Sequence, residues 1–316
     1  MSLVEAPRMK GSGNDGYGTL DRNLARAAGR EARRHRSSRV RVRRDVGKKG
    51  GPPSGAGGLA ATVALLLVVA GLYIVGGVPL QLFLGEPGLL LAQLTFLLLP
   101  PLVFVWWARL DPVWTLSLRW PSGGQLGGGI LVLLGGTQLA WILAWAQSLV
   151  MPVPAEYLEA MASLLQADSL GRYLWLLVLA AVVPALAEEV LFRGVVLSGF
   201  RSALPTLWAV VGAGLVFGLF HLSPQTAFRF LPTAWLGMLL AWVVVVSGSL
   251  PLAILLHFLN NAAILTIVAI PATREQMTDI EGEPSLLLLP VGLLLLGWGL
   301  WILHANRGPR VPEEAG

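Results

Sequence analysis

The seven residues EEVLFRG (188–194) place two carboxylates and a guanidinium inside a long apolar segment, at about residues 171–200. Ionisable groups inside a bilayer are costly, so they usually face a polar cavity and mark function. On a helix, Glu189 and Arg193 share one face and can neutralise each other. Glu188 points about 100° away from that pair and has no charged partner nearby in sequence. The spacing therefore predicts a structural pair, Glu189–Arg193, beside a functional Glu188.

The composition is that of a membrane protein. Of the 316 residues, 55% are hydrophobic and 13% are charged, whereas ordinary soluble domains carry about 25% charged residues. The chain has no cysteine. Disulfides, cysteine-ligated zinc and a cysteine nucleophile are thereby excluded.

The first 57 residues are polar and basic, without apolar periodicity. Residues 1–50 hold 14 of the 23 Lys and Arg residues, so we expect a disordered basic cytoplasmic arm at residues 1–57. The arm precedes the first apolar segment closely, which favours a positive-inside topology signal over binding to anionic lipids. Nucleic-acid binding is the weakest alternative, and no nucleic acid is expected as a partner.

Eight apolar segments follow the arm, each close to or above the ~20 residues that cross a bilayer. The predicted fold is an all-α, polytopic membrane helical bundle with about eight transmembrane helices in residues 58–304, followed by a C-terminal tail, 305–316. Loop charges place both termini in the cytoplasm by majority. The segments lie at roughly 58–84, 88–108, 125–150, 171–200, 204–221, 228–247, 250–270 and 285–304.

Two of the four histidines lie in the same half of the chain as Glu188. His221 ends one apolar segment, and His257 shares a helix face with Asn261, four residues later. Glu188 and these three residues come from three of the four segments between residues 171 and 270 and are nearly the only ionisable or amide groups in those three. Convergence on one polar cavity explains this better than unrelated packing roles. Asn260 lies about 100° off that face, which favours a helix–helix hydrogen bond.

Straight helices would place these groups at unequal depths. With ~1.5 Å rise per residue, Glu188, His221 and His257 differ by roughly 10–15 Å along the membrane normal. Convergence therefore requires tilt, different helix boundaries or kinks, for which the chain offers Pro184, Pro205 and Pro251.

The residue types suit hydrolysis of an amide. A Glu beside a His can polarise water as a general base, and a second His with an Asn can donate hydrogen bonds to an oxyanion. The alternative is that Glu188, His221 and His257 bind zinc, for which two His and one Glu form a common catalytic set. The sequence has no His-Glu-x-x-His helix, no Gly-x-Ser-Gly in an apolar segment and no aspartate in the last six segments. Other intramembrane protease patterns are therefore unsupported.

Three motifs in order resemble the CPBP intramembrane proteases, which include type II CAAX prenyl endopeptidases and bacteriocin-processing proteins. They are EE-x3-R from Glu188, F-x3-H from Phe217 and H-x3-N from His257. The resemblance covers about residues 171–270, the predicted protease core. It implies that Glu188 and His221 activate water, that His257 and Asn261 stabilise the oxyanion, and that Glu189–Arg193 is structural. The family has been described both as metal-dependent and as metal-independent.

We therefore expect an intramembrane endopeptidase that hydrolyses peptide bonds of a membrane-associated or prenylated substrate. No cofactor is expected to be required, because an amide such as Asn261 is a poor zinc ligand; zinc is the alternative cofactor. The substrate peptide is expected to enter from the bilayer or the cytoplasmic side, with membrane lipids as further partners. The expected location is a bacterial inner membrane. The alternative function is a non-catalytic scaffold or regulator that binds a partner helix or lipid in the same cavity.

Overall fold

A computed structural model describes residues 58–223, 226–269 and 288–308, all within the unit Pro52–Gly316. Every regular element among them is helical, which confirms the predicted all-α class. The predicted disordered arm, 1–57, lies outside the described residues, as does most of the predicted tail.

Six helical segments in the described residues are long and apolar enough to cross a membrane. Two further apolar helices are shorter, α12 (Thr206–Phe220) and α16 (Leu289–Ala305). These two correspond to the predicted spans 204–221 and 285–304, so eight is an approximate number of crossings. The six long segments are Leu59–Leu84, Glu86–Trp107, Gly123–Ser148, Leu170–Arg201, Ala227–Ser247 and Leu250–Ala269.

Several long segments are interrupted by π-helical turns, in which the backbone repeat widens by one residue. The first two spans each contain one such turn, and the fourth contains two. The elements in order are α2 (Leu59–Leu72), η1 (Tyr73–Gly77), α3 (Val78–Leu84), α4 (Glu86–Ala92), η2 (Gln93–Leu98), α5 (Leu99–Trp107), α6 (Pro112–Thr115), α7 (Gly123–Ser148), α8 (Ala155–Leu164), α9 (Leu170–Leu177), η3 (Val178–Val182), α10 (Val183–Glu189), η4 (Val190–Val196), α11 (Leu197–Arg201), α12, the 3₁₀ turn η5 (Ala227–Arg229), α13 (Phe230–Ser247), α14 (Leu250–Ala269) and α16.

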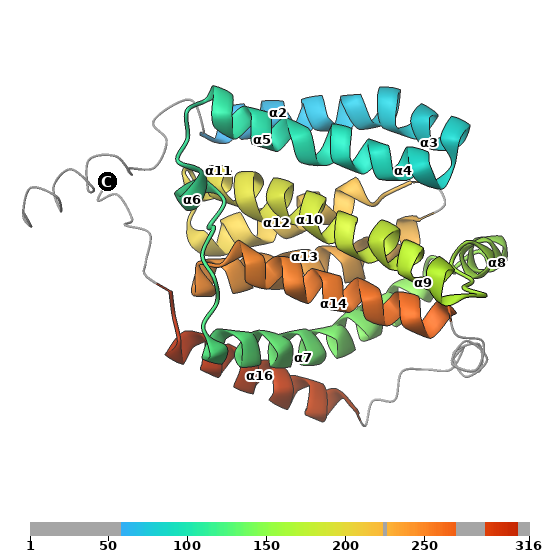
Figure 1. Ribbon diagram of the computed structural model, residues 1–316. Coiled ribbons are helices and arrows are strands. Elements are labelled where there is room, and N and C mark those ends of the chain that lie inside the picture. Colours follow the sequence, from blue (N-terminus) through green and yellow to red (C-terminus); the bar gives the residue numbers. More distant parts are fainter. Residues whose placement is uncertain (1–57, 224–225, 270–287, 309–316) are drawn as a thin grey trace, which may run out of the picture. The chain divides into compact units, whose positions relative to one another are not determined.

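The helices stack in layers around the segment that contains EEVLFRG (Figure 1). The two N-terminal spans, α2 to α5, pack on one side of α10 and η4, and α14 packs on another. Helix α12 packs along α13, α13 packs on α7, and α7 pairs with α16. The segment Leu170–Arg201 is accordingly the most buried of the six, with 56% of its most apolar window covered.

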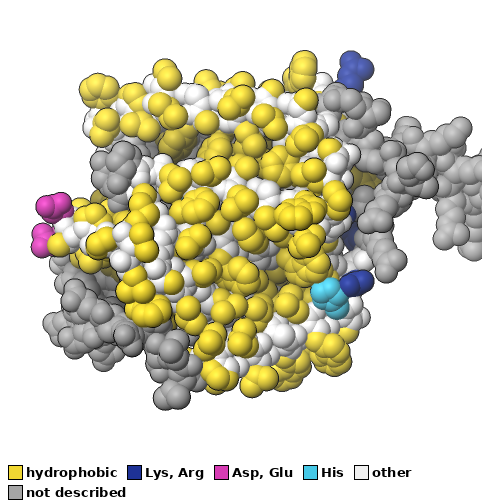
Figure 2. Space-filling model, turned by 180° about the vertical axis from the view of Figure 1, so that it is seen from behind, with side chains coloured by type: hydrophobic (Ala, Val, Ile, Leu, Met, Phe, Trp, Pro, Cys, Tyr) yellow, Lys and Arg dark blue, Asp and Glu magenta, His cyan; other side chains and the backbone are white. Residues whose placement is uncertain are grey.

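Most of the molecular surface is apolar, as a protein surrounded by lipid requires. Figure 2 shows one face covered by hydrophobic side chains, with acidic side chains at one edge and basic side chains near the opposite edge. Large hydrophobic residues are exposed along the first two spans in particular, among them Leu67, Val75, Leu82, Phe83 and Trp106. The protein is therefore an integral membrane protein with several membrane-spanning helices.

Glycines allow α12 and α13 to approach closely, as small residues often do between membrane helices. A Cβ on Gly237 would lie 2.8 Å from the Cα of Gly214, too close for a side chain. Helix α13 ends at Gly248, whose φ of 66° is the left-handed conformation that glycine adopts without strain. The close packing brings the carbonyl of Gly237 and the end of α12 to the centre of the bundle.

An ion pair fixes the register between α4 and α9. Both terminal nitrogens of Arg172 bind the carboxylate of Glu86, each at 2.6 Å, and Nε1 of Trp175 donates to the same carboxylate at 2.7 Å. The start of the second span thus lies beside the start of the fourth. Further along, α5 packs against η4, so these two segments run parallel.

Candidate active site

Glu188 lies near the end of α10, between the π-helical turns η3 and η4. Its Oε2 atom is buried and has no hydrogen-bond partner in the described residues. Pro184, one turn earlier, cannot donate a backbone hydrogen bond, which loosens the helix at this point. The local sequence therefore presents an unpaired carboxylate from an irregular stretch of helix, as functional sites often do.

Two nearly equal stretches of helix, which meet at the Arg201 end, bring His221 to the depth of Glu188. At ~1.5 Å per residue, Glu188 is about 20 Å from the Arg201 end of its segment, and α12 is about 22 Å long. Because α12 starts directly after that end and stops at Phe220, His221 reaches the level of Glu188. The depth difference expected from straight helices was wrong, since Nε2 of His221 lies 3.7 Å from Oε2 of Glu188.

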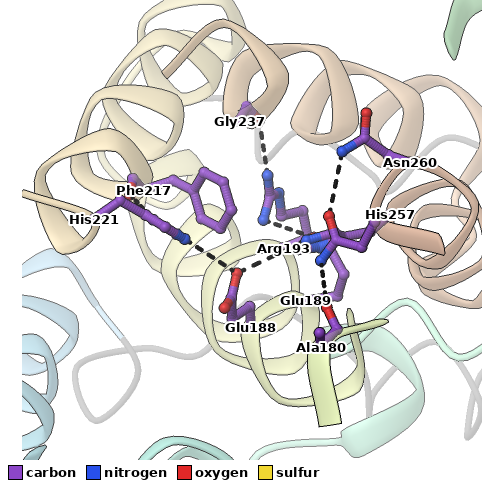
Figure 3. Close-up of polar contacts among 10 residues, drawn as sticks. Ala180, Glu188, Glu189, Arg193, Phe217, His221, Gly237, His257 and Asn260 are labelled. Atoms are coloured by element: carbon purple, nitrogen blue, oxygen red, sulfur yellow. Dashed lines mark hydrogen bonds and ion pairs between the residues drawn. The ribbon is translucent and has the colours of Figure 1, made fainter. Parts of the chain in front are cut away.

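The backbone of α12 fixes the imidazole of His221. Its Nδ1 lies 2.8 Å from the carbonyl oxygen of Phe217, which can only accept, so Nδ1 carries the proton. In the neutral ring, Nε2 is then the atom with the free lone pair. Figure 3 shows this atom directed at Glu188.

His257 approaches Glu188 from the other side, on α14. Its Nε2 lies 3.9 Å from Oε2 of Glu188, while its Nδ1 lies 2.7 Å from Oε1 of Glu189. The carboxylate accepts a hydrogen bond from Nδ1–H, and Nε2 again faces Glu188 (Figure 3). The predicted convergence of Glu188, His221 and His257 is therefore present.

Glu189 and Arg193 form the predicted ion pair. Oε1 of Glu189 lies 2.7 Å from Nη1 of Arg193, and the two side chains are 0% and 1% exposed. The guanidinium also donates to the carbonyl of Gly237 at 3.4 Å. The same Glu189 oxygen also binds Nδ1 of His257, so the pair contacts a candidate site residue. Sequence spacing along one helix could not reveal this contact with α14.

Phe217 packs at the centre of the site. Its ring centre lies 4.6 Å from that of His221 and 6.0 Å from that of His257, and the guanidinium carbon of Arg193 is 4.2 Å from its centre. The ring thus lies beside three polar side chains of the site. In the sequence, Phe217 is marked only as the first residue of the F-x3-H motif, and the motif predicted no role for its side chain.

The side-chain amide of Asn261 binds a backbone carbonyl and a neighbouring side chain. Its Nδ2 donates to the carbonyl of Ala180 at 3.2 Å, and its Oδ1 accepts from Asn260 at 3.2 Å. Ala180 precedes Pro184 by four residues, so proline leaves this carbonyl without its α-helical donor. Asn261 supplies the missing donor. The expected helix–helix hydrogen bond of Asn260 was wrong, because Asn260 binds its neighbour on the same helix.

The predicted zinc alternative was Glu188, His221 and His257. Each histidine has Nδ1 bound to an oxygen and Nε2 turned toward Glu188, the orientation in which histidines bind metals. The separations of 3.7 and 3.9 Å exceed the ~3.3–3.5 Å between ligand atoms around tetrahedral zinc, from the usual bond lengths. Among the described residues, no group of three or more His, Cys, Asp or Glu side chains has the spacing of a metal site.

Comparison with known proteins bears on the same segment. No curated protein and no solved structure matches the chain. A family model matches residues 170–263, which include Glu188, Glu189, Arg193, His221, His257 and Asn261, and this family consists of proteases. The match confirms over these residues the predicted resemblance to the CPBP proteases: this part of the chain is similar to the family described as Type II CAAX prenyl endopeptidase Rce1-like.

Proposed function

We propose that the protein is an intramembrane endopeptidase that hydrolyses a peptide bond in a membrane-associated or prenylated substrate. The observation that carries the proposal is the position of Glu188 Oε2, buried between Nε2 of His221 at 3.7 Å and Nε2 of His257 at 3.9 Å. Both distances are too long for direct hydrogen bonds. A water molecule to one side of the line between the two atoms can form a hydrogen bond to each of them. The similarity of residues 170–263 to a protease family supports this reading.

Glu188 and His221 activate the attacking water. A water oxygen about 2.8 Å from both Oε2 and Nε2 fits the 3.7 Å between them. Nε2 of His221 accepts one hydrogen bond from this water and fixes its orientation. Glu188 removes the proton as the water oxygen bonds to the carbonyl carbon, and later gives that proton to the leaving amine as the C–N bond breaks.

His257 and Asn261 stabilise the oxyanion of the tetrahedral intermediate. His257 donates from Nε2 as an imidazolium, with the carboxylate of Glu189 as its counter-ion at Nδ1. Asn261 has two N–H groups and uses one for Ala180. Its second N–H is the proposed oxyanion donor, and the bond to Ala180 fixes the orientation of the amide.

The proposed setting is a bacterial inner membrane with both termini in the cytoplasm. Arg119 lies at one end of the bundle, where its carbonyl accepts from Ser249, and Arg307 follows α16 at this end, since Gly308 binds Val246. Helix α8 carries Glu156 and Glu159 and connects the third span to the fourth at the opposite end of the bundle. This polarity supports the orientation by the positive-inside rule. No metal or other cofactor is required in the scheme.

The test compares wild-type protein with Glu188→Gln in liposomes, on a fluorogenic peptide that ends in a farnesylated CAAX sequence. The amide has the shape of the carboxylate but cannot take a proton, so we expect turnover to fall by about 10²–10⁴. Glu156→Gln, on the exposed helix α8, is the matched control and should cleave normally. Mass spectrometry of protein termini in membranes containing each variant should reveal the natural substrate.

Near-normal turnover by Glu188→Gln would remove Glu188 as the base. If wild-type protein yields no new termini and no peptide cleavage, the scaffold or regulator alternative replaces the protease.

A further inference from the structure

In the part of the chain that the structure describes, two buried polar side chains outside the site each have an oxygen without a hydrogen-bond partner. Four side-chain atoms in the described residues are buried without a hydrogen bond: Oε2 of Glu188, Oε2 of Glu189, Oγ1 of Thr62 and Oε1 of Gln93. The first two belong to the site, and Thr62 is pressed against Gly199. Gln93, only 7% exposed, remains unexplained.

Gln93 lies on the face of the second span that meets the helix carrying Glu188. It forms a buried stripe with Leu97, Pro101 and Val105, each four residues apart. Leu97 and Val105 share a core cluster with Ala187 of α10, and η2 packs against α10. Because the second and fourth spans run parallel and η2 packs against α10, Gln93, the first residue of η2, lies near the start of α10.

A second polar group comes from the first span. Tyr73 begins η1, as Gln93 begins η2, and these two turns pack together. The hydroxyl of Tyr73 has no hydrogen bond in the described part of the chain, and it lies within electrostatic reach of the Glu188 carboxylate. Both residues thus stand at π-helical turns, as Glu188 does between η3 and η4, and π-helical turns concentrate at functional sites.

We propose that Gln93 binds the main chain of the substrate peptide next to the scissile bond, with Tyr73 as a second hydrogen-bonding group. A carboxamide offers one acceptor and two donors, the complement of a peptide unit. Left alone, a buried amide oxygen is destabilising, and an extended peptide beside Glu188 would satisfy it. The inference rests on the proposed function. It assigns Gln93 and Tyr73 to a peptide-binding surface, here called the substrate wall, on two spans that lie outside residues 170–263.

The test separates peptide binding from chemistry. Gln93→Leu removes the amide and keeps most of the volume; Gln81→Leu makes the same change at an exposed site on α3. With the farnesylated CAAX peptide we expect Gln93→Leu to raise KM about tenfold or more, with kcat changed by less than about threefold. Its melting temperature should equal or exceed that of the wild type, because an unpaired buried group has been removed. A wild-type KM, or a lower melting temperature than that of Gln81→Leu, would overturn the proposal.

Two further arms keep the result decisive. Tyr73→Phe deletes a single hydroxyl and should raise KM several-fold; an unchanged KM removes Tyr73 from the wall. The affinity of the same peptide is also measured for Glu188→Gln protein with and without Gln93→Leu. If the wild type does not cleave but Gln93→Leu still weakens binding, the proposed function fails and the substrate wall stands. If the peptide does not bind, or binds equally well with and without Gln93→Leu, the proposed substrate wall is wrong whether or not the wild type cleaves the peptide.

Discussion

Glu189 holds the imidazole of His257 in place from a neighbouring helix, with Oε1 of the carboxylate 2.7 Å from Nδ1 of the ring. The same oxygen binds Arg193 at 2.7 Å. One buried carboxylate thus neutralises the charge of Arg193 and also orients the ring of His257. The adjacent glutamates accordingly have separate surroundings, since Glu188 lies between Nε2 of His221 and Nε2 of His257, whereas Glu189 binds His257 and Arg193.

Glu189→Gln should lower kcat more than it changes KM. The amide can still accept a hydrogen bond, but it is no counter-ion for His257 or Arg193, and lost orienting partners typically cost about 10–100-fold in activity. The measurement is steady-state kinetics on the farnesylated peptide, with Glu159→Gln on the exposed helix α8 as the control. Wild-type kcat in a folded Glu189→Gln protein would contradict the role in orienting His257.

Arg193→Ala should destabilise the fold, because it leaves the Glu189 carboxylate buried without its guanidinium. Removing one partner of a buried pair costs about 3–5 kcal/mol, and Glu189→Ala should behave similarly. The double variant should be less destabilised than either single variant, since no isolated charge remains. The measurement is thermal unfolding in detergent.

The control for this experiment is the other ion pair of the described residues that joins Arg to Glu. Arg172 and Glu86 are 29% and 24% exposed, so Arg172→Ala should cost no more than about 1 kcal/mol. Equal losses for Arg172→Ala and Arg193→Ala would argue against burial as the cause.

Asn261→Ala should reduce the rate by about 10²–10³, the usual loss for one oxyanion donor. Part of that loss would come from the freed carbonyl of Ala180, and Pro184→Ala separates the two effects by restoring a backbone N–H that can bind it. In the Pro184→Ala background, a remaining 10²-fold effect of Asn261→Ala on kcat is the oxyanion contribution. If Asn261→Ala has no effect there, Asn261 only supports the helix break.

Chelation should leave activity intact, because the proposed chemistry uses only protein groups and water. Purified protein dialysed against excess chelator should retain its turnover, and elemental analysis should detect less than stoichiometric zinc. The result that overturns the metal-free scheme is loss of turnover with chelator and its recovery with micromolar zinc. In that case the ion would be the main Lewis acid.

The sequence predicted those parts of the site that follow from helical spacing and the cost of buried charge. Glu189 and Arg193 are four residues apart, so their pairing required only one helix. The meeting of Glu188 with His221 and His257 followed from the scarcity of polar groups in three apolar segments. These inferences needed no knowledge of how the helices pack.

Contacts between distant helices lay beyond such inference. The bond from Glu189 to His257 and the one from Asn261 to Ala180 depend on the position of α14 against α10 and η3. Helix ends were equally decisive, since the short α12 removes the depth mismatch that straight spans imply. The π-helical turns that begin at Tyr73 and Gln93 have no marker in the amino-acid sequence, because local preference hardly distinguishes them from α-helix.

The short helix α12 also has a consequence for the lipid around it. Its 15 residues are about 22 Å long, whereas the hydrocarbon layer is about 30 Å thick, and thinning of the bilayer beside it is one way to match the two lengths. His221 directly follows the last residue of α12, so thinning at that end would bring it closer to the bilayer surface. A thinned bilayer there shortens the path from bulk solvent to a hydrolytic centre and lowers the cost of drawing a polar peptide out of the headgroup region. Membrane thickness should therefore tune the rate, with short-chain lipids favouring turnover.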